Sequence, residues 1–207
     1  MARKKTDKIV FEHVEVLDAG AKGVCVAKAP DGKVIFIPNV VPGDVVDVQT
    51  VKKRKAYYEG RATQVHTFSE HRVEPVCDHF GSCGGCKWQN MAYSQQLVYK
   101  QQEVYNHLKR IGKIELPEFD PILGSKEQFF YRNKMEFSFS NARWLTPEEI
   151  QSGEELGKEN ALGFHIPKMW DKILDIKKCW LQGDPSNDIR NEIREFANQH
   201  QMEFFNP

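Results

Sequence analysis

Short segments of alternating hydrophobic and polar residues fill the first third of the chain. In "GVCVAKA", Val24 and Val26 lie on one face of the expected strand and Cys25 and Ala27 on the other. The turn "PDG" joins this segment to "KVIFIP", the turn "VPGD" precedes "VVDVQTV", and a last strand is expected over residues 58–65. Such closely spaced short strands predict a small closed OB-like barrel, because closure leaves no exposed strand edge, with an open meander as the alternative.

Two longer segments have the periodicity of helices. The first is "NMAYSQQLVYKQQEVYNHLKRIG", for which Asn90 is the expected N-cap and Gly112 the expected end. The second is "DPSNDIRNEIREFANQHQ", which Asp184 or Ser186 would cap. The apolar positions expected to face the core are, in the first helix, Leu97, Val104, Leu108 and Ile111, and in the second, Ile189, Ile193, Phe196 and Ala197.

The remaining periodic segments predict strands between the helices. They are "FFYRNKMEFSFS", "ALGFHI" and "KILDI", whereas the acidic "LTPEEIQSGEELGKEN" is expected to form an exposed loop or a short helix. The chain as a whole therefore has a mixed fold class, an all-β barrel followed by an α+β or α/β unit. We expect a barrel over residues 1–68, a cysteine-rich loop over 69–93 and a central α/β domain over 94–207. The ending "MEFFNP" reads as an interrupted strand, so this domain is expected to be incomplete at its C-terminus.

Composition narrows the class of protein. Of the 207 residues, 40% are hydrophobic and 28% are charged, as in ordinary globular chains. No stretch of about eighteen apolar residues is present, so no membrane span is expected, and the basic start lacks the apolar core of a secretory signal. We therefore expect a cytoplasmic protein, in which structural disulfides are improbable.

The charge is balanced overall but uneven along the chain. Residues 1–76 contain 13 Lys and Arg against 10 Asp and Glu, and four of the basic residues are consecutive, at positions 52–55. A basic run is usually only a solvated face, yet here tyrosines follow it directly. Phosphates attract cations and bases stack on flat rings, so this segment is a candidate site for single-stranded nucleic acid. The candidate contacts are Lys52, Lys53, Arg54, Lys55, Tyr57, Tyr58 and Arg61.

Three of the five cysteines lie within "CDHFGSCGGC". Cys77, Cys83 and Cys86 are interleaved with glycines that allow sharp turns around a bulky centre and amide contacts to sulfur. Cys179, far downstream, is a reasonable fourth ligand. An iron–sulfur cluster is the best interpretation, while a zinc site with four thiolates and a redox pair in "CGGC" remain alternatives. Trp88 is expected to pack over this centre, and the histidines show no i, i+4 metal-binding spacing.

The segment from "DAGAKGVCVAKAPDGKVIFIPNVVPGD" through "VKKRKAYYEGRATQV" resembles a TRAM domain, an OB-like barrel of RNA-modifying enzymes. With the cysteine motif, "GGCKWQ" and the later lone cysteine, the chain is similar to RNA (uracil-5-)-methyltransferases, especially those acting on 23S ribosomal RNA. The resemblance implies a 4Fe–4S cluster on Cys77, Cys83, Cys86 and Cys179. It also implies RNA contacts in "FFYRNKMEFSF", for which the candidates are Arg132, Asn133 and Lys134.

In the family that the chain resembles, a cysteine thiolate adds to C6 of uracil, S-adenosylmethionine supplies the methyl group and a general base removes the C5 proton. These groups belong to a C-terminal domain, and the chain has no glycine-rich strand-to-helix turn to bind that cofactor. The one remaining cysteine, Cys25, is expected to be a buried strand residue. The resemblance thus implies no catalytic or S-adenosylmethionine-binding residue here, an inactive fragment of a monomeric enzyme, and 23S rRNA as its partner.

Three alternatives to that function differ in class. A complete, noncatalytic RNA-binding protein with a bound metal would have the same motifs, and a transfer RNA methyltransferase is a further possibility. A radical methylthiotransferase with a TRAM domain is disfavoured, since such enzymes have a C-x3-C-x2-C motif and carry TRAM at the other end.

Overall fold

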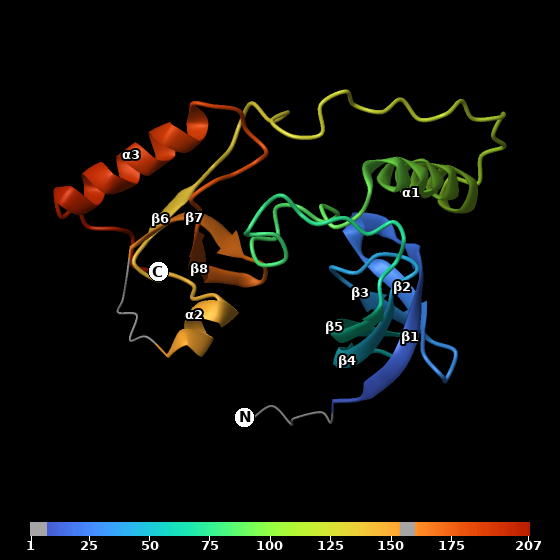
Figure 1. Ribbon diagram of the computed structural model, residues 1–207. Coiled ribbons are helices and arrows are strands. Elements are labelled where there is room, and N and C mark those ends of the chain that lie inside the picture. Colours follow the sequence, from blue (N-terminus) through green and yellow to red (C-terminus); the bar gives the residue numbers. More distant parts are fainter. Residues whose placement is uncertain (1–7, 154–159) are drawn as a thin grey trace. The chain divides into compact units, whose positions relative to one another are not determined.

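The computed structural model describes residues 8–153 and 160–207, and it divides into two compact units that alternate along the chain (Figure 1). The first unit comprises Met1–Glu74 and Lys87–Gly124, and the second comprises Pro75–Cys86 and Ser125–Pro207. The cysteine-rich loop therefore belongs to the second unit, although first-unit segments flank it on both sides.

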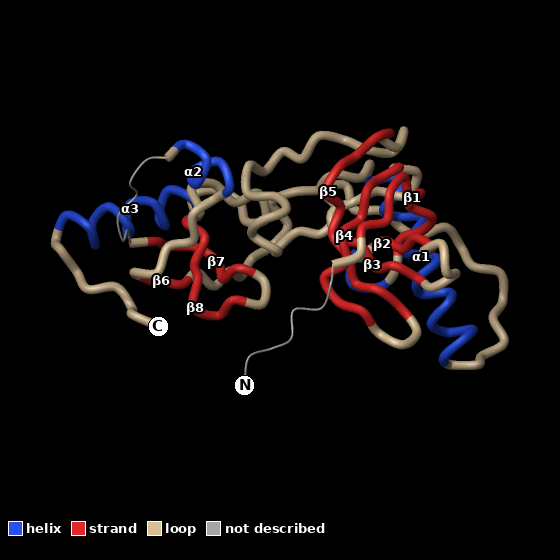
Figure 2. The backbone as a smooth tube through the Cα atoms, turned by 90° about the horizontal axis from the view of Figure 1, so that it is seen from below, coloured by secondary structure: helices blue, strands red, loops and turns tan. Residues whose placement is uncertain are grey.

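Five strands of the first unit form a closed barrel in the order β1-β2-β3-β5-β4, which confirms the predicted closure (Figure 2). The β3–β5 pair is parallel and the other pairs are antiparallel. A short 3-10 turn, Ala21–Gly23, connects the first two strands. The strands are β1 (Val10–Ala19), β2 (Cys25–Lys28), β3 (Val34–Ile37), β4 (Val45–Lys53) and β5 (Tyr57–Thr67).

Alternation along these strands fills the interior of the barrel. Ile35 and Ile37 of β3 and Val46 and Val48 of β4 are completely buried, as the period of two in the sequence predicts. Gly60 in β5 permits a close approach, because a Cβ atom there would lie 2.4 Å from Val48 Cγ1. The core of the barrel is thus apolar and tightly packed.

A buried carboxylate fixes the turn before β4. The Asp44 side chain is fully buried and accepts hydrogen bonds from the backbone amides of Val41, at 2.7 Å, and Ser69, at 2.9 Å. The guanidinium of Arg72 forms an ion pair with the same carboxylate. Asp44 therefore ties the turn to the segment that leaves the barrel.

The first predicted helix is present, but the predictions of its N-cap and of its buried face are wrong. Helix α1 (Tyr93–Asn106) continues into a π-helical turn, His107–Ile111. Asn90 is not the cap: it is buried and donates to the carbonyl oxygen of Asn39 at 3.2 Å. No residue of α1 is buried, because the helix is held through half-buried side chains such as Tyr99, which packs against a small apolar cluster of the same unit.

The second unit contains a three-stranded antiparallel sheet in the order β6-β7-β8, together with two helices. The predicted strands "ALGFHI" and "KILDI" are confirmed, whereas only the end of "FFYRNKMEFSFS" is a strand and the rest is irregular. The elements are β6 (Ser138–Ser140), α2 (Pro147–Ser152), β7 (Ala161–Ile166), β8 (Met169–Asp175) and α3 (Ser186–Gln199).

The short helix α2 begins at a capping box within the acidic segment. Thr146 Oγ1 accepts from the backbone amide of Glu149, and the Glu149 carboxylate accepts from the backbone amide of Thr146. Part of the acidic segment, residues 154–159, lies outside the described residues. Within the described part of the chain, no helix combines the length and the apolar character needed to cross a membrane.

The predicted apolar stripe of α3 is largely wrong. Ile189, Ile193 and Phe196 are about half exposed, at 54%, 47% and 57%, and only Ala197 of the stripe is buried. Asn187 and Arg190 are buried instead, at 6% and 4% exposure. The reason is that α3 meets a backbone segment whose carbonyl and amide groups need polar partners. Neither proposed side-chain cap is present, since no side chain caps the N-terminus of this helix.

Candidate metal centre

The four predicted cysteine ligands converge in the second unit. Cys83 and Cys86 pack against an apolar cluster that includes buried Cys179. Cys77 lies close enough to Cys86 and Cys179 for a negative charge on either of them to raise the pKa of Cys77. The fold thus brings a local motif together with a thiol 93 residues further along the chain. The apolar residues around them include Ile166, Leu174, Ile176 and Leu181.

Backbone turns aim amide groups at the thiols. The amide of His79 donates to the sulfur of Cys77, and the amide of Gly85 donates to that of Cys83. Gly84 has a positive φ of 72°, and a Cβ atom there would lie 2.3 Å from Pro167 Cγ. Only glycine is compatible with this turn, which explains the presence of Gly84 in the motif.

Burial favours the protonated form of two of these thiols, Cys77 and Cys83. It raises the pKa of Cys77 above its ordinary value and that of Cys83 to about 11. Neighbouring cysteines add to the effect, because each thiolate disfavours another nearby. A metal that binds here therefore displaces protons, and its charge stabilises the thiolates.

Helix α3 holds the fourth cysteine through polar side chains. Asn187 Oδ1 accepts from the amide of Cys179 at 2.8 Å, and Asn187 Nδ2 donates to the Cys179 carbonyl at 3.1 Å. Arg190 donates to the carbonyl oxygens of Ile176, at 3.1 Å, and Lys177, at 2.6 Å. The backbone around Cys179 is thereby fixed.

Arg190 also places a cation in the interior near Cys179. It is 4% exposed and lies within electrostatic range of Cys179, and its Nη1 has no hydrogen-bond partner among the described residues. A buried, incompletely paired guanidinium is costly unless a negative charge lies nearby. The four cysteines suit such an arrangement, because thiolates around a metal centre carry negative charge.

Two kinds of metal centre differ in the spacing that they require of the thiols. In a tetrahedral zinc site, Zn–S bonds of about 2.3 Å place the sulfurs about 3.8 Å apart. Within the described part of the chain, no three of the four sulfurs lie all within 4.8 Å of one another. A 4Fe–4S cluster needs wider spacing, because each thiolate binds a different iron. Four thiols in an apolar surrounding can hold either centre once their side chains turn toward the metal.

Trp88 does not cover the cysteines as the sequence suggested. Its buried neighbours are Val41 and Met91, in an apolar cluster of the first unit. The chain has already entered the first unit at Lys87, directly after Cys86. The aromatic residue next to the fourth cysteine is Trp180, which packs against Phe129 and Phe130.

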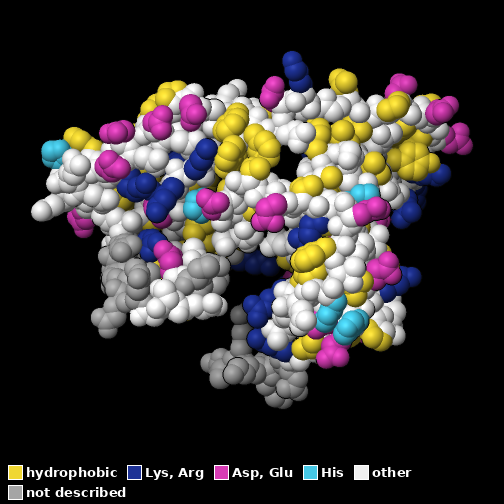
Figure 3. Space-filling model, in the orientation of Figure 1, with side chains coloured by type: hydrophobic (Ala, Val, Ile, Leu, Met, Phe, Trp, Pro, Cys, Tyr) yellow, Lys and Arg dark blue, Asp and Glu magenta, His cyan; other side chains and the backbone are white. Residues whose placement is uncertain are grey.

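The basic run lies at the hairpin between β4 and β5, and its four side chains are exposed. Lys52 pairs with Glu59 at 3.7 Å, and exposed Arg61 donates to Gln49. Lys and Arg side chains gather along one edge of the barrel in Figure 3. Cations are therefore available there for phosphate groups.

The two tyrosines after the run differ in exposure. Tyr57 is half-buried, with its ring at 5.3 Å from that of Phe36. Tyr58 is 3% exposed, belongs to the core of the barrel and donates its hydroxyl to Asp31 at 2.9 Å. Tyr58 therefore cannot offer a ring face to a base, which corrects its assignment as an RNA contact.

The second set of candidate contacts is anchored beside Cys179. The amide of Arg132 donates to the carbonyl oxygen of Leu181 at 2.7 Å, two residues after that cysteine. The side chains of Arg132, Asn133 and Lys134 are exposed, and Lys134 pairs with Glu136 at 2.8 Å. A metal centre that orders the segment around Cys179 would consequently also fix the backbone of these residues.

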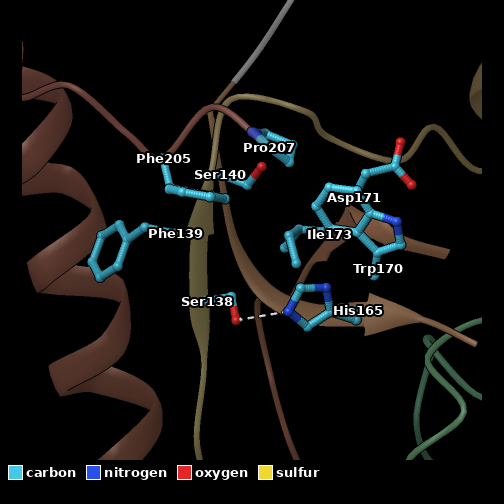
Figure 4. Close-up of a pocket in the computed structure, with 9 residues that line it drawn as sticks. All are labelled: Ser138, Phe139, Ser140, His165, Trp170, Asp171, Ile173, Phe205 and Pro207. Carbon is cyan, nitrogen blue, oxygen red and sulfur yellow. Dashed lines mark hydrogen bonds between the residues drawn. The ribbon is translucent and has the colours of Figure 1, made fainter.

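A separate pocket of about 330 Å³ lies on the sheet of the second unit (Figure 4). Ser138 of β6 and His165 of β7 line it as a hydrogen-bonded pair, with Ser138 Oγ 3.1 Å from His165 Nε2. Trp170 of β8 and Phe205 supply apolar walls. None of the predicted site residues lines this pocket, so it is not part of the cysteine centre.

The remaining cysteine is a core residue, as predicted. Cys25 is 1% exposed, and its thiol donates to the carbonyl oxygen of Val40 at 3.1 Å. Burial, with the nearby carboxylates of Asp44 and Asp18, raises the pKa of Cys25 to about 12.

We expect Cys25 to resist alkylation in the native chain. A pKa of about 12 in place of 9 lowers the thiolate fraction by on the order of 1,000-fold, and the thiolate is the nucleophile. Iodoacetamide followed by mass spectrometry should leave Cys25 unmodified until denaturant unfolds the barrel. Native labelling at the rate of an exposed thiol would contradict its place in the core.

The structure also brings together three side chains that the sequence did not single out as a group. His13, Asp47 and His66 lie on three adjacent strands of the barrel, β1, β4 and β5. Their separation along the chain hides them from any search for local metal-binding spacing. Strand register was the signal that could have found them.

Comparison with known proteins finds a domain and several relatives that this chain resembles. A family model described as "TRAM domain" matches residues 12–63, the span of the barrel. A protein of Bacteroides thetaiotaomicron named "Uncharacterized RNA methyltransferase" is 54% identical over 186 residues, which are 90% of this chain and 41% of that protein. A Porphyromonas gingivalis protein of the same name is 46% identical over 90% of this chain and 40% of its own length. The chain thus contains a TRAM domain and is similar to proteins named RNA methyltransferase.

A solved structure shares the fold of this chain. It is the Pyrococcus abyssi tRNA (uracil-54, C5)-methyltransferase in complex with S-adenosyl-L-homocysteine, with a TM-score of 0.59 and 23% identity. The match covers 94% of this chain and 39% of that chain. The chain thus spans about two fifths of the length of these relatives.

Proposed function

We propose that this chain is the RNA-binding and 4Fe–4S portion of an S-adenosylmethionine-dependent methyltransferase that acts on C5 of uracil in 23S rRNA. The observation that carries the proposal is the convergence of Cys77, Cys83, Cys86 and Cys179 in a chain that contains a TRAM domain and is similar to proteins named RNA methyltransferase. In the whole enzyme, S-adenosylmethionine would supply the methyl group. The residues of this chain bind and orient RNA.

The cysteine centre has an organising role in this proposal. Four thiolates would hold the cluster, Arg190 would balance part of its charge, and Asn187 would hold the backbone of Cys179. The centre joins the loop Pro75–Cys86 to the segment that carries Cys179 and the neighbouring Arg132. It thereby orders an RNA-contacting surface and takes no part in the transfer of the methyl group.

The basic run is expected to dominate the salt dependence of RNA binding. Each phosphate contact on single-stranded RNA contributes about 0.7 to the slope of log affinity against log salt. Replacing Lys52, Lys53, Arg54 and Lys55 together by Ala should therefore lower the slope by roughly two to three. Fluorescence anisotropy with a labelled single-stranded RNA at several salt concentrations measures it.

The matched control for the basic run is a set of exposed lysines elsewhere on the first unit. Replacing Lys8, Lys100, Lys109 and Lys113 by Ala removes the same charge, so the whole-protein field changes equally. We expect this variant to keep most of the slope. An equal decrease of the salt-dependence slope in the two variants would show that RNA binding depends on net charge alone and not on the position of the basic run.

Methyl transfer itself tests the proposed activity. The protein, produced at the length of its relatives, should transfer label from S-adenosylmethionine to C5 of uracil in 23S rRNA, while the 207-residue chain alone should transfer none. Nucleoside analysis after digestion identifies the product. Label in transfer RNA alone would overturn the substrate, and label in no RNA would favour a noncatalytic RNA-binding protein.

A further inference from the structure

Two histidines and an aspartate form a compact group on the surface of the barrel. One ligand atom from each of His13, Asp47 and His66 lies within 4.8 Å of the other two. His66 Nε2 is 2.7 Å and His13 Nδ1 is 3.9 Å from Asp47 Oδ1. Histidine side chains gather on this face of the barrel in Figure 3.

The fold holds the group in place through an irregularity of β1. The pairing of β1 with β4 shifts register between Phe11 and Val14, and His13 lies in this bulge with a positive φ of 52°. Its backbone amide donates to Asp47 Oδ1 at 2.9 Å. The bulge turns the ring of His13 onto that of His66, with centroids 4.0 Å apart and planes 13° apart.

These distances match the needs of a small transition-metal ion. Zinc bonds to imidazole nitrogen and carboxylate oxygen are about 2.0–2.2 Å long, so tetrahedral ligands lie about 3.3 Å apart. The observed 2.7 Å and 3.9 Å lie on either side of that value. A metal would replace the contact between His66 and Asp47. The stacked rings of His13 and His66 would also have to rotate out of their parallel arrangement, because an imidazole binds a metal in the plane of its own ring.

The chemistry of the donors selects the class of ion. Two imidazoles and one carboxylate suit Zn²⁺ and neighbouring divalent transition metals, whereas Mg²⁺ and Ca²⁺ prefer oxygen ligands alone. His13 is 68% exposed and Asp47 and His66 are 17% and 22% exposed, so an ion can enter from solvent and keep a water ligand. Asp47 is held as a carboxylate, since the amide of His13 and the ring of His66 lower its pKa.

We propose that His13, Asp47 and His66 form a second metal site, for Zn²⁺ or a similar divalent transition metal, on the barrel of the first unit. The site shares no residue with the cysteine centre of the second unit. A barrel that binds RNA through its surface would then carry a divalent cation with an open position for water or a phosphate oxygen. The proposal stands whether or not the proposed methyltransferase activity does.

Titration of the chain with Zn²⁺ tests the site residue by residue. In a sample labelled with nitrogen-15 at its seven histidines and with its cysteine centre loaded, ring resonances of His13 and His66 should shift together and saturate at one equivalent. Those of His71 and His200 should stay unchanged. Shifts confined to His79, beside the cysteines, or no shift below millimolar Zn²⁺ would overturn the proposal.

Two variants remove ligands while preserving the backbone. Glycine adopts a positive φ freely, so His13→Gly keeps the bulge, and Asp47→Asn keeps an acceptor for the His13 amide. Loss of an outer partner of a metal ligand costs about 10–100-fold in affinity, so each ligand variant should weaken Zn²⁺ binding at least tenfold. The control His71→Ala, taken from an imidazole–carboxylate pair with Glu70 at 3.8 Å, should bind as the parent does. Unchanged affinity in His13→Gly would mean that the group is only a hydrogen-bonded pair.

Discussion

We expect Cys179→Ala to abolish the proposed iron–sulfur centre. Iron and sulfide should fall from about four of each per chain to near zero. The fourth thiol lies beside Cys83 and Cys86 in the apolar cluster, and no other cysteine can take its place, because Cys25 lies in the barrel. Anaerobic purification followed by iron and sulfide analysis and visible absorption measures the loss. Since the centre ties two chain segments together, hydrogen exchange should also rise more in the second unit than in the barrel.

The matched control is Cys25→Ala, which removes a buried thiol from the other unit and should keep the full complement of iron. Cys179→Ser keeps the shape of the side chain and the contacts of Asn187 with the backbone, so it separates loss of a ligand from a packing defect. Stoichiometric zinc without sulfide in the parent chain would refute the cluster. Full iron and sulfide in both Cys179 variants would refute the assignment of this ligand.

Asp44→Ala will destabilise the barrel by about 3–5 kcal/mol, the cost typical of breaking a buried ion pair from one side. The change leaves the amides of Val41 and Ser69 without their acceptor and the guanidinium of Arg72 without its carboxylate partner. Buried donors that lose a partner pay their full desolvation cost. Urea denaturation followed by a barrel-specific signal measures the free energy of unfolding.

Asp120→Ala is the control for this prediction. Asp120 is an exposed carboxylate of the same unit, and its replacement should change the free energy of unfolding by no more than about 0.5 kcal/mol. Equal stability of the two variants would show that the network around Asp44 contributes little. A lower free energy of unfolding in Asp44→Ala with the same denaturant slope would support it.

The barrel was predictable because alternation in a strand determines burial directly. Cys25 and Ala27 face the core as one set, and the turns at "PDG" and "VPGD" fix where each strand begins. Tyr58 shows the limit of this reasoning. Its neighbourhood is basic, but its position in the strand directs its ring inward.

The faces of the helices were not predictable because they depend on what each helix meets. Helix α3 lies against the backbone of the segment 176–179, where Asn187 and Arg190 satisfy carbonyl and amide groups. A hydrophobic stripe in the sequence cannot report such a partner. Because Asn187 and Arg190 occupy the face of α3 that meets this backbone, Ile189 and Phe196 are left exposed.

Some candidate metal ligands could be predicted from the sequence and others could not. The local spacing of Cys77, Cys83 and Cys86 identifies them as candidate ligands. Cys179 could be added to this ligand set because few other cysteines remain in the chain. His13, Asp47 and His66 have no local spacing at all. Only the pairing of β1 with β4 and of β4 with β5 brings them together.

The interleaving of the two units has a consequence for how the protein is made. The last of the three clustered cysteines, Cys86, is synthesised 93 residues before the fourth, Cys179. At about 5–20 residues per second, the nascent chain carries an incomplete ligand set for roughly 5–20 s. During that interval the barrel can close, because its strands are already synthesised, while the loop Pro75–Cys86 waits for Cys179. The ligand set is therefore completed only after the barrel has been synthesised, and a ribosome stalled before residue 179 would hold the whole barrel and three of the four thiols.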